Sequence, residues 1–163
     1  MNTKKVTRTA AFVAAAVLLG YVESLFPPIA AGVKLGLANT AVLVVLYLGD
    51  TKSAWAVAVM KVILCAALFG SASSFVYSLS GAVISLLVMS IAKKTNWFSL
   101  AAVSSLGGVF HNLAQLLCAY FFIGKGVLFY IPLLCISGGV CGLLTGIAAK
   151  ILVRRGRELF GEE

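Results

Sequence analysis

Apolar residues fill six runs of this chain, separated by short polar or glycine-rich breaks. A helix needs about 20 residues to cross the roughly 30 Å hydrocarbon core of a bilayer. The pattern predicts an all-α membrane protein, a single six-helix bundle over residues 1–163. The expected spans are residues 8–26, 36–49, 53–69, 74–92, 98–123 and 127–153. The second run is short, so a tilted or partly re-entrant helix is an alternative there, although its unbroken apolar centre favours a span.

The composition excludes a soluble domain. Hydrophobic residues make up 61% of the chain and charged residues only 11%, which is too little polar material for the surface of a water-soluble protein. In lipid, a polar side chain is costly unless it is paired or lines a cavity. Each polar residue inside a span is therefore a functional candidate.

Basic residues indicate the orientation. With the N-terminus in the cytoplasm, ten of the 13 Lys and Arg fall on the inner side, and Lys34 and Lys125 fall outside. The positive-inside rule then predicts cytoplasmic termini. The net charge of +8 reports this topology and an affinity for anionic membrane lipid. Nucleic-acid binding is not expected, because it would need a basic patch on a soluble face.

Lys61 is the one basic residue within a span. Its long stem is expected to extend to the cytoplasmic interface. The alternative is an internal partner, for which Glu23 is the only carboxylate embedded in the membrane.

The first span has a second interpretation, since Lys4 and Lys5 before an apolar run resemble a secretory signal peptide. Glu23 and the Pro27-Pro28 pair stand where a small-residue cleavage site would be expected. Cleavage would also leave an odd number of spans. We therefore expect the first span to be retained.

Glycine recurs every four residues in the last span, at Gly138, Gly142 and Gly146. Small residues at this spacing let helix backbones approach closely, so tight packing is predicted there. The four cysteines lie in apolar spans without a Cys-x-x-Cys pair, and we expect small buried hydrophobic residues rather than a metal or redox site. They are Cys65, Cys118, Cys135 and Cys141.

The first span carries two pairs of alanines four residues apart, near its cytoplasmic end. One pair is Ala10 and Ala14, and the other is Ala11 and Ala15. They either pack within the bundle or form a docking face for the helix of a partner. The composition alone does not separate these two interpretations.

Several polar residues share one predicted depth in the outer half of the membrane. At about 1.5 Å per helical residue, Glu23 lies about 22 Å, Asn39 about 25 Å, and the group at 111–115 about 20 to 25 Å from the inner boundary. That group comprises His111, Asn112 and Gln115, and Lys34 lies in the loop just above. A hydrogen-bond network that fixes helix packing is one explanation. The number of groups, and the presence of both signs of charge, favour a pocket for a polar or zwitterionic small molecule.

The sequence lacks the residues that several kinds of catalysis require. A phosphate loop for ATP hydrolysis is missing, and Asp50 is the only aspartate, whereas a magnesium-dependent prenyl synthase needs several to hold metal and diphosphate. His111 is the only histidine. We expect no catalytic residues, no bound metal and no cofactor, and therefore no self-sufficient enzyme.

Two stretches carry a family resemblance. The sequence from Gly32 to Asn39 and the sequence from Gly107 to Gln115 resemble the Gx transporter family, whose members are often labelled heptaprenyl diphosphate synthase component I. This family is similar to the substrate-binding S components of energy-coupling factor (ECF) transporters. The resemblance covers nearly the whole chain. It implies a multi-pass protein of the bacterial cell membrane that takes up a small cofactor, vitamin or precursor.

The resemblance also implies roles for particular residues. The alanines at 10, 11, 14 and 15 would dock on a transmembrane T component, which is driven by two cytoplasmic ATPases. The pocket would comprise Glu23, Lys34, Asn39, His111, Asn112 and Gln115. The alternative is a membrane subunit that does not transport, associated with isoprenoid or quinone biosynthesis or with a quinone- or flavin-linked electron-transfer assembly. The identity of the substrate is not encoded in any of these features.

Overall fold

The computed structural model describes residues 3–25 and 36–160, and every regular element within them is helical. The elements are α1 (Thr3–Ser24), α2 (Leu37–Leu48), α3 (Thr51–Phe69), α4 (Ala72–Thr95), α5 (Leu100–Ile123), the short 3₁₀ helix η1 (Lys125–Tyr130) and α6 (Ile131–Phe160). By length and composition, five of the six α-helices can cross a membrane, and α2 is the shorter one. The prediction of an all-α, six-helix membrane protein is confirmed.

Side-chain caps determine where three of the helices begin. Asp50 precedes α3, Ser71 precedes α4 and Ser99 precedes α5, and each accepts the backbone N–H three residues further on. Such caps satisfy donors that the first helical turn leaves unpaired. The polar breaks seen in the sequence are therefore turns that start the next helix.

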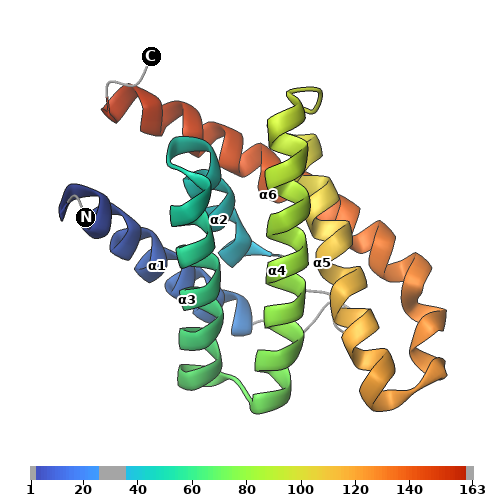
Figure 1. Cartoon of the computed structure of the whole chain (residues 1–163). Helices are drawn as coiled ribbons and strands as arrows, with labels where there is room; N and C mark the ends of the chain where they lie inside the picture. Colours follow the sequence, from blue (N-terminus) through green and yellow to red (C-terminus); the bar gives the residue numbers. More distant parts are fainter. Residues whose placement is uncertain (1–2, 26–35, 161–163) are drawn as a thin grey trace.

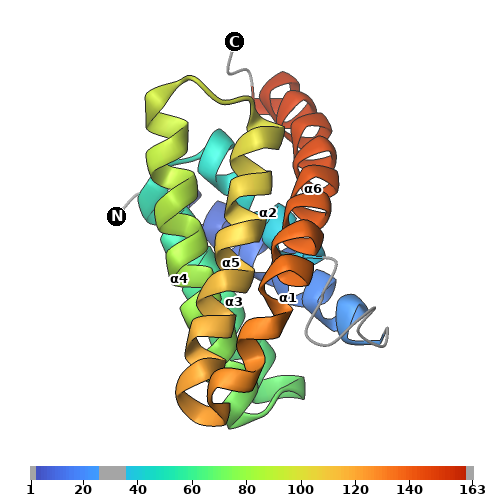
Figure 2. The ribbon, with the colours of Figure 1, turned by 90° about the vertical axis from the view of Figure 1, so that its right-hand side faces the viewer.

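The short helix α2 lies in the centre of the bundle. Nine of its 12 residues are buried, and Figure 2 shows it behind α4 and α5. A helix that is apolar on all sides is typical of such a position. Its 12 residues reach only about 18 Å. A full crossing by the second predicted span, residues 36–49, therefore stays a prediction. Phe26, the last residue of the first predicted span, lies outside the described residues.

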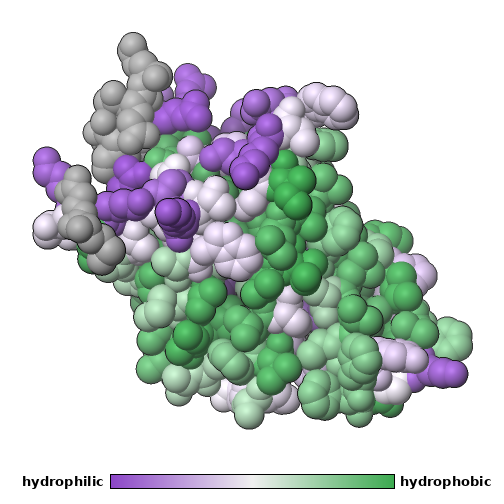
Figure 3. All heavy atoms as spheres, viewed as in Figure 1, coloured by the Kyte–Doolittle hydropathy of each residue, from purple (hydrophilic) through white to green (hydrophobic). Residues whose placement is uncertain are grey.

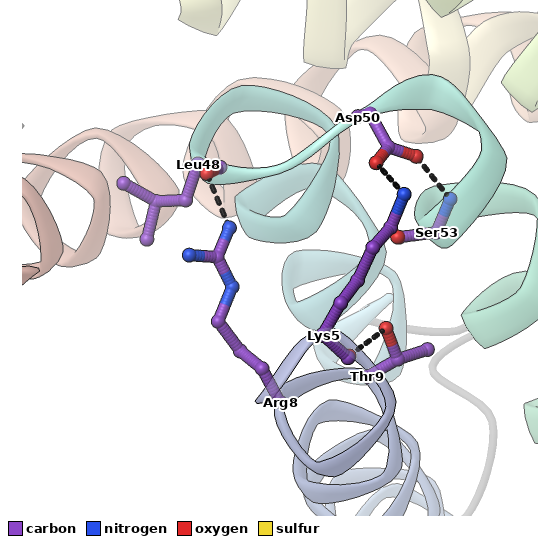
Figure 4. A network of polar contacts seen from close by, with 6 residues as sticks. All are labelled: Lys5, Arg8, Thr9, Leu48, Asp50 and Ser53. Atoms are coloured by element: carbon purple, nitrogen blue, oxygen red, sulfur yellow. Dashed lines mark hydrogen bonds and ion pairs between the residues drawn. The ribbon is translucent and has the colours of Figure 1, made fainter. Parts of the chain in front are cut away.

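Both termini lie toward one end of the bundle, which we call the terminal end (Figure 1). Lys5 of α1 forms an ion pair with Asp50, and Arg8 donates to the carbonyl of Leu48, so the start of α1 is tied to the turn between α2 and α3 (Figure 4). Hydrophilic residues gather at this end, and apolar ones cover most of the rest of the face in Figure 3. Placement of this end in the cytoplasm remains a prediction from the basic residues.

Glycines bring α5 and α6 into backbone contact. A Cβ atom on Gly138 would lie 2.6 Å from the carbonyl oxygen of Gly108, and one on Gly142 would lie 2.6 Å from that of Ser104. A Cβ on Gly146 would lie 2.7 Å from the Cα of Ala101. The prediction of tight packing by these glycines is confirmed, and their partner helix is α5.

Candidate ligand-binding cavity

A narrow cavity of about 190 Å³ runs inside the bundle, and all six α-helices contribute to its lining. Along α4 the lining extends from Ser74 to Met89, a rise of about 22 Å. Ser24, Gly70 and Ser74 line the cavity close to the end of the bundle opposite the termini. The cavity therefore reaches from that end past the middle of the bundle, to Met89 of α4 and Ser104 of α5.

Five of the six residues predicted for a pocket line this one cavity. They are Glu23 from α1, Asn39 from α2, and His111, Asn112 and Gln115 from α5. Lys34, the sixth, lies outside the described residues. The structure thus brings together polar groups that are far apart in the sequence, and the role of each toward a ligand stays a prediction.

Lys61 also lines the cavity, and the expectation that it extends to the membrane interface is wrong. The residue is only 8% exposed, and its Nζ donates to Oδ1 of Asn39 over 2.6 Å. The physical reason is a polar partner inside the bundle, which spares the ammonium the cost of unpaired burial in lipid. This partner is an amide of α2, whereas the sequence had suggested the carboxylate of Glu23.

The depth of α2 explains this contact. Asn39 lies nine residues before Leu48, where α2 ends, and Lys61 lies ten residues after Thr51, where α3 begins. Both are therefore about 14 to 15 Å from the terminal end. The estimate of about 25 Å for Asn39 assumed a helix that crosses the whole membrane. Because α2 is shorter, the polar layer lies nearer the middle of the bundle than predicted.

Glu23 holds the start of α2. Its Oε1 accepts the backbone N–H of Gly36, which stands immediately before the helix. Gly36 has a φ of 77°, in the left-handed region that favours glycine. The carboxylate therefore joins the last turn of α1 to the start of α2 at the cavity wall.

His111 faces α4 at a glycine. A Cβ atom on Gly81 would lie 2.8 to 2.9 Å from three atoms of the imidazole ring, so the ring occupies the space that a side chain would take. The missing side chain at Gly81 is thus what positions His111 in the lining.

Asn112 makes a contact that belongs to packing. Its Nδ2 donates to the carbonyl of Leu134 in α6 over 2.9 Å. Such interhelical bonds of amide side chains stabilise membrane bundles. At this residue, the packing explanation considered from the sequence has direct support. Among the described residues, Gln115 forms no such interhelical hydrogen bond.

A row of serines on α4 was missed from the sequence. Ser74, Ser78 and Ser85 all line the cavity, at spacings of four and seven residues that place them on one helix face. This periodicity was visible in the sequence. Burying serine in a membrane helix costs little free energy, because its hydroxyl can donate to a backbone carbonyl of the preceding turn. The hydroxyl of Ser80 donates to the carbonyl of Tyr77 in this way. A serine within a span is therefore a weaker sign of a functional site than a charged residue.

The alanine pairs of α1 lie on the surface. Ala10, Ala11, Ala14 and Ala15 are all exposed, whereas the neighbouring Ala16 is fully buried. Within the described part of the chain, these four side chains are not buried by packing. Their face lies around the middle of α1, on the side of Glu23 that leads to the terminal end.

Asp50 lies apart from the cavity. Its ion pair with Lys5 and the N–H of Ser53 lower the pKa of this carboxyl from 3.8 to about 2. Figure 4 shows both contacts at the terminal end. The single aspartate of the chain therefore serves as a helix cap and an anchor for α1.

Comparison with known proteins places most of the chain in one family. The model of the family described as heptaprenyl diphosphate synthase component I matches residues 12–152. Comparisons with curated proteins and with solved structures gave no match. The family resemblance inferred from the sequence is thereby confirmed under that description.

Proposed function

The chain belongs to the heptaprenyl diphosphate synthase component I family and folds as a membrane-type helical bundle, and we propose that it is the substrate-binding membrane subunit of an ECF-type transporter. Its substrate is a small cofactor, vitamin or precursor. The observation that carries this proposal is the cavity, in which an ammonium, a carboxylate, amides and hydroxyls line one space inside an otherwise apolar bundle. Such a lining suits selective binding of a polar small molecule.

The exposed alanines support a coupling role. A row of small side chains lets another helix approach closely, and the alanines at 10, 11, 14 and 15 are exposed rather than packed. We propose that they dock a transmembrane T component, which cytoplasmic ATPases drive. This protein is then not an enzyme itself, and its only aspartate is held at the terminal end by Lys5.

The alternative function follows from the wording of the family description. In that case the chain is a non-transporting subunit that serves isoprenoid or quinone biosynthesis, or a quinone- or flavin-linked electron-transfer assembly. The size of the cavity speaks against an isoprenoid inside it. A cavity of about 150 Å³ accommodates benzene, and this one has about 190 Å³. A chain of seven isoprene units would have to bind elsewhere.

An uptake assay tests the proposal. Small molecules that co-purify with the protein are identified by mass spectrometry, and the strongest candidate is offered to vesicles that contain the chain, a T component and the ATPases. ATP-dependent accumulation supports transport. Binding that persists without accumulation favours the alternative function.

Variants of α1 test the docking role within the same assay. Ala14→Trp should abolish co-purification with the T component and stop uptake, while ligand binding by the isolated chain survives because Ala14 is exposed. Ile136→Trp is the matched control, since Ile136 is 68% exposed and lies on α6, away from the alanine face of α1. Loss of folding in Ala14→Trp, comparable to that expected for the buried Ala16→Trp, would contradict an exposed docking face.

A further inference from the structure

Two side chains of opposite charge line the cavity around the start of α2. Lys61 is buried and donates to Asn39, and Glu23 accepts the N–H of Gly36. Gly36 and Asn39 are one helical turn apart, and the N–H of Asn39 donates to the carbonyl of Gly36. The ammonium and the carboxylate are therefore held by neighbouring backbone and side-chain groups of a single turn.

Both groups have capacity for a ligand beyond these contacts. A lysine ammonium carries three donors and a carboxylate has about four acceptor positions, so the bonds to Asn39 and Gly36 do not by themselves use up either group, and both residues line the cavity. Charged ligand groups lose their hydration when they enter such a site, and only an opposite charge at hydrogen-bond distance compensates for that loss. A ligand with one charge would satisfy one of these groups and place its uncharged part against the other.

The cavity also limits the size of the ligand. With about 190 Å³, it holds a molecule somewhat larger than benzene, which fits about 150 Å³. Ser74, Ser78 and the amide of Gln115 supply hydrogen-bonding groups along the same space, whereas the hydroxyl of Ser85 donates to the carbonyl of Gly107. Bulky cofactors with several rings exceed this volume.

Taking the proposed binding function as given, we propose that the cavity selects a compact zwitterion of the amino-acid type. Its carboxylate pairs with the ammonium of Lys61, and its amino group pairs with the carboxylate of Glu23. Asn39 and Gly36 position the two charges. This assignment adds Lys61, which the sequence placed at the interface, to the residues that determine specificity.

Three probes of nearly equal shape test the assignment. Leucine carries both charges, leucinamide only the positive one, and 4-methylpentanoate only the negative one. Binding to the purified full chain in nanodiscs is measured by calorimetry and by the shift of the unfolding temperature. Leucine should bind at least about tenfold more tightly than either analogue, since each analogue lacks one of the two charges that Lys61 and Glu23 would recognise.

Matched neutral variants assign each charge to its residue. Lys61→Gln should lose the preference for leucine over leucinamide, and Glu23→Gln should lose the preference for leucine over 4-methylpentanoate. Both replacements keep hydrogen-bonding capacity toward α2, which protects the fold. Lys125→Gln, at an exposed position outside the cavity lining, should bind all three probes as the unchanged protein does.

Three results would overturn the assignment. They are equal affinities for the three probes, no binding of any probe, and selectivity that stays the same in both variants while both lose stability. The last result would show that Lys61 and Glu23 serve the fold alone. None of them decides the proposed function, which fails if vesicles with the T component and the ATPases show no ATP-dependent uptake of a co-purifying molecule.

Discussion

The interface between α5 and α6 and the junction between α1 and α2 form two walls of the same cavity by different means. Glycines place the backbones of α5 and α6 in direct contact. At the other wall, the side chains of Glu23, Asn39 and Lys61 hold the start of α2. Backbone contacts in a close-packed interface cannot rearrange without separating the helices, whereas polar side chains can exchange one partner for another. The first wall is therefore a fixed scaffold, and the second is the one that a ligand can engage.

The largest effect is expected at the fixed wall. A Cβ atom on Gly108 would lie 2.2 Å from the carbonyl oxygen of Gly138. Overpacking costs about 1 to 3 kcal/mol where side chains can move, and here a backbone would have to move. Gly108→Leu should therefore abolish the folded bundle, measured by yield and by size-exclusion chromatography in detergent.

The matched control for that substitution is Gly126→Leu, since a Cβ on Gly126 would meet nothing within 4 Å. This variant should behave like the unchanged protein. Folded Gly108→Leu with an unaltered unfolding temperature would show that the two helices are not in backbone contact.

The next effect separates ligand binding from helix packing at two neighbouring amides of α5. Gln115→Ala should weaken binding of the co-purifying ligand by roughly ten- to a hundredfold, since an unpaired polar group costs about 1 to 3 kcal/mol. Asn112→Ala should mainly lower stability, by about 0.6 to 1.7 kcal/mol, because it removes the bond to Leu134. Affinity and unfolding temperature are measured on both variants. The distinction fails if both variants keep full affinity and both lose stability.

A smaller effect is expected from Gly81→Ala. The added Cβ would meet the imidazole of His111 at 2.8 Å, and the ring must shift within the lining. Ligand affinity should fall several-fold, as measured by calorimetry. In a His111→Ala background the same substitution should have no further effect, because neighbouring changes that act through one contact are not additive. An equal loss in both backgrounds would mean that Gly81 acts independently of His111.

The smallest effect concerns the terminal end. The ion pair with Lys5 and the N–H of Ser53 hold the pKa of Asp50 at about 2 in the folded chain, against 3.8 ordinarily. A depressed pKa contributes stability that is complete above about pH 4 and is lost as the pH falls through about 2. The contribution is below about 1 kcal/mol, as for other exposed ion pairs.

The contribution of Asp50 to stability is measured from the unfolding temperatures of the unchanged protein and of Asp50→Asn, recorded between about pH 4 and about pH 2. The two curves should converge as the pH falls. Parallel curves over the whole range would contradict the role of this ion pair.

The helices could be predicted from the sequence because membrane spans depend on local hydropathy. The packing of α6 could be predicted because glycines four residues apart mainly serve close contact between helix backbones. It failed at Lys61. The depth of Asn39 depends on where α2 starts, and neither the length of the apolar run nor its composition specifies this. The alignment of Ser74, Ser78 and Ser85 on one face of α4 could have been predicted, because these residues follow helical periodicity. The direction in which that face points could not, because it depends on how α4 packs against its neighbours.

Native mass spectrometry of the purified chain tests most directly whether the cavity is a ligand site. The unchanged protein and Lys125→Gln should both retain a small molecule whose mass fits the cavity. Ser78→Trp, which fills the space beside the polar layer, should lose that molecule while keeping a folded bundle. Retention of the same mass by folded Ser78→Trp, or its absence from the unchanged protein, would contradict the account.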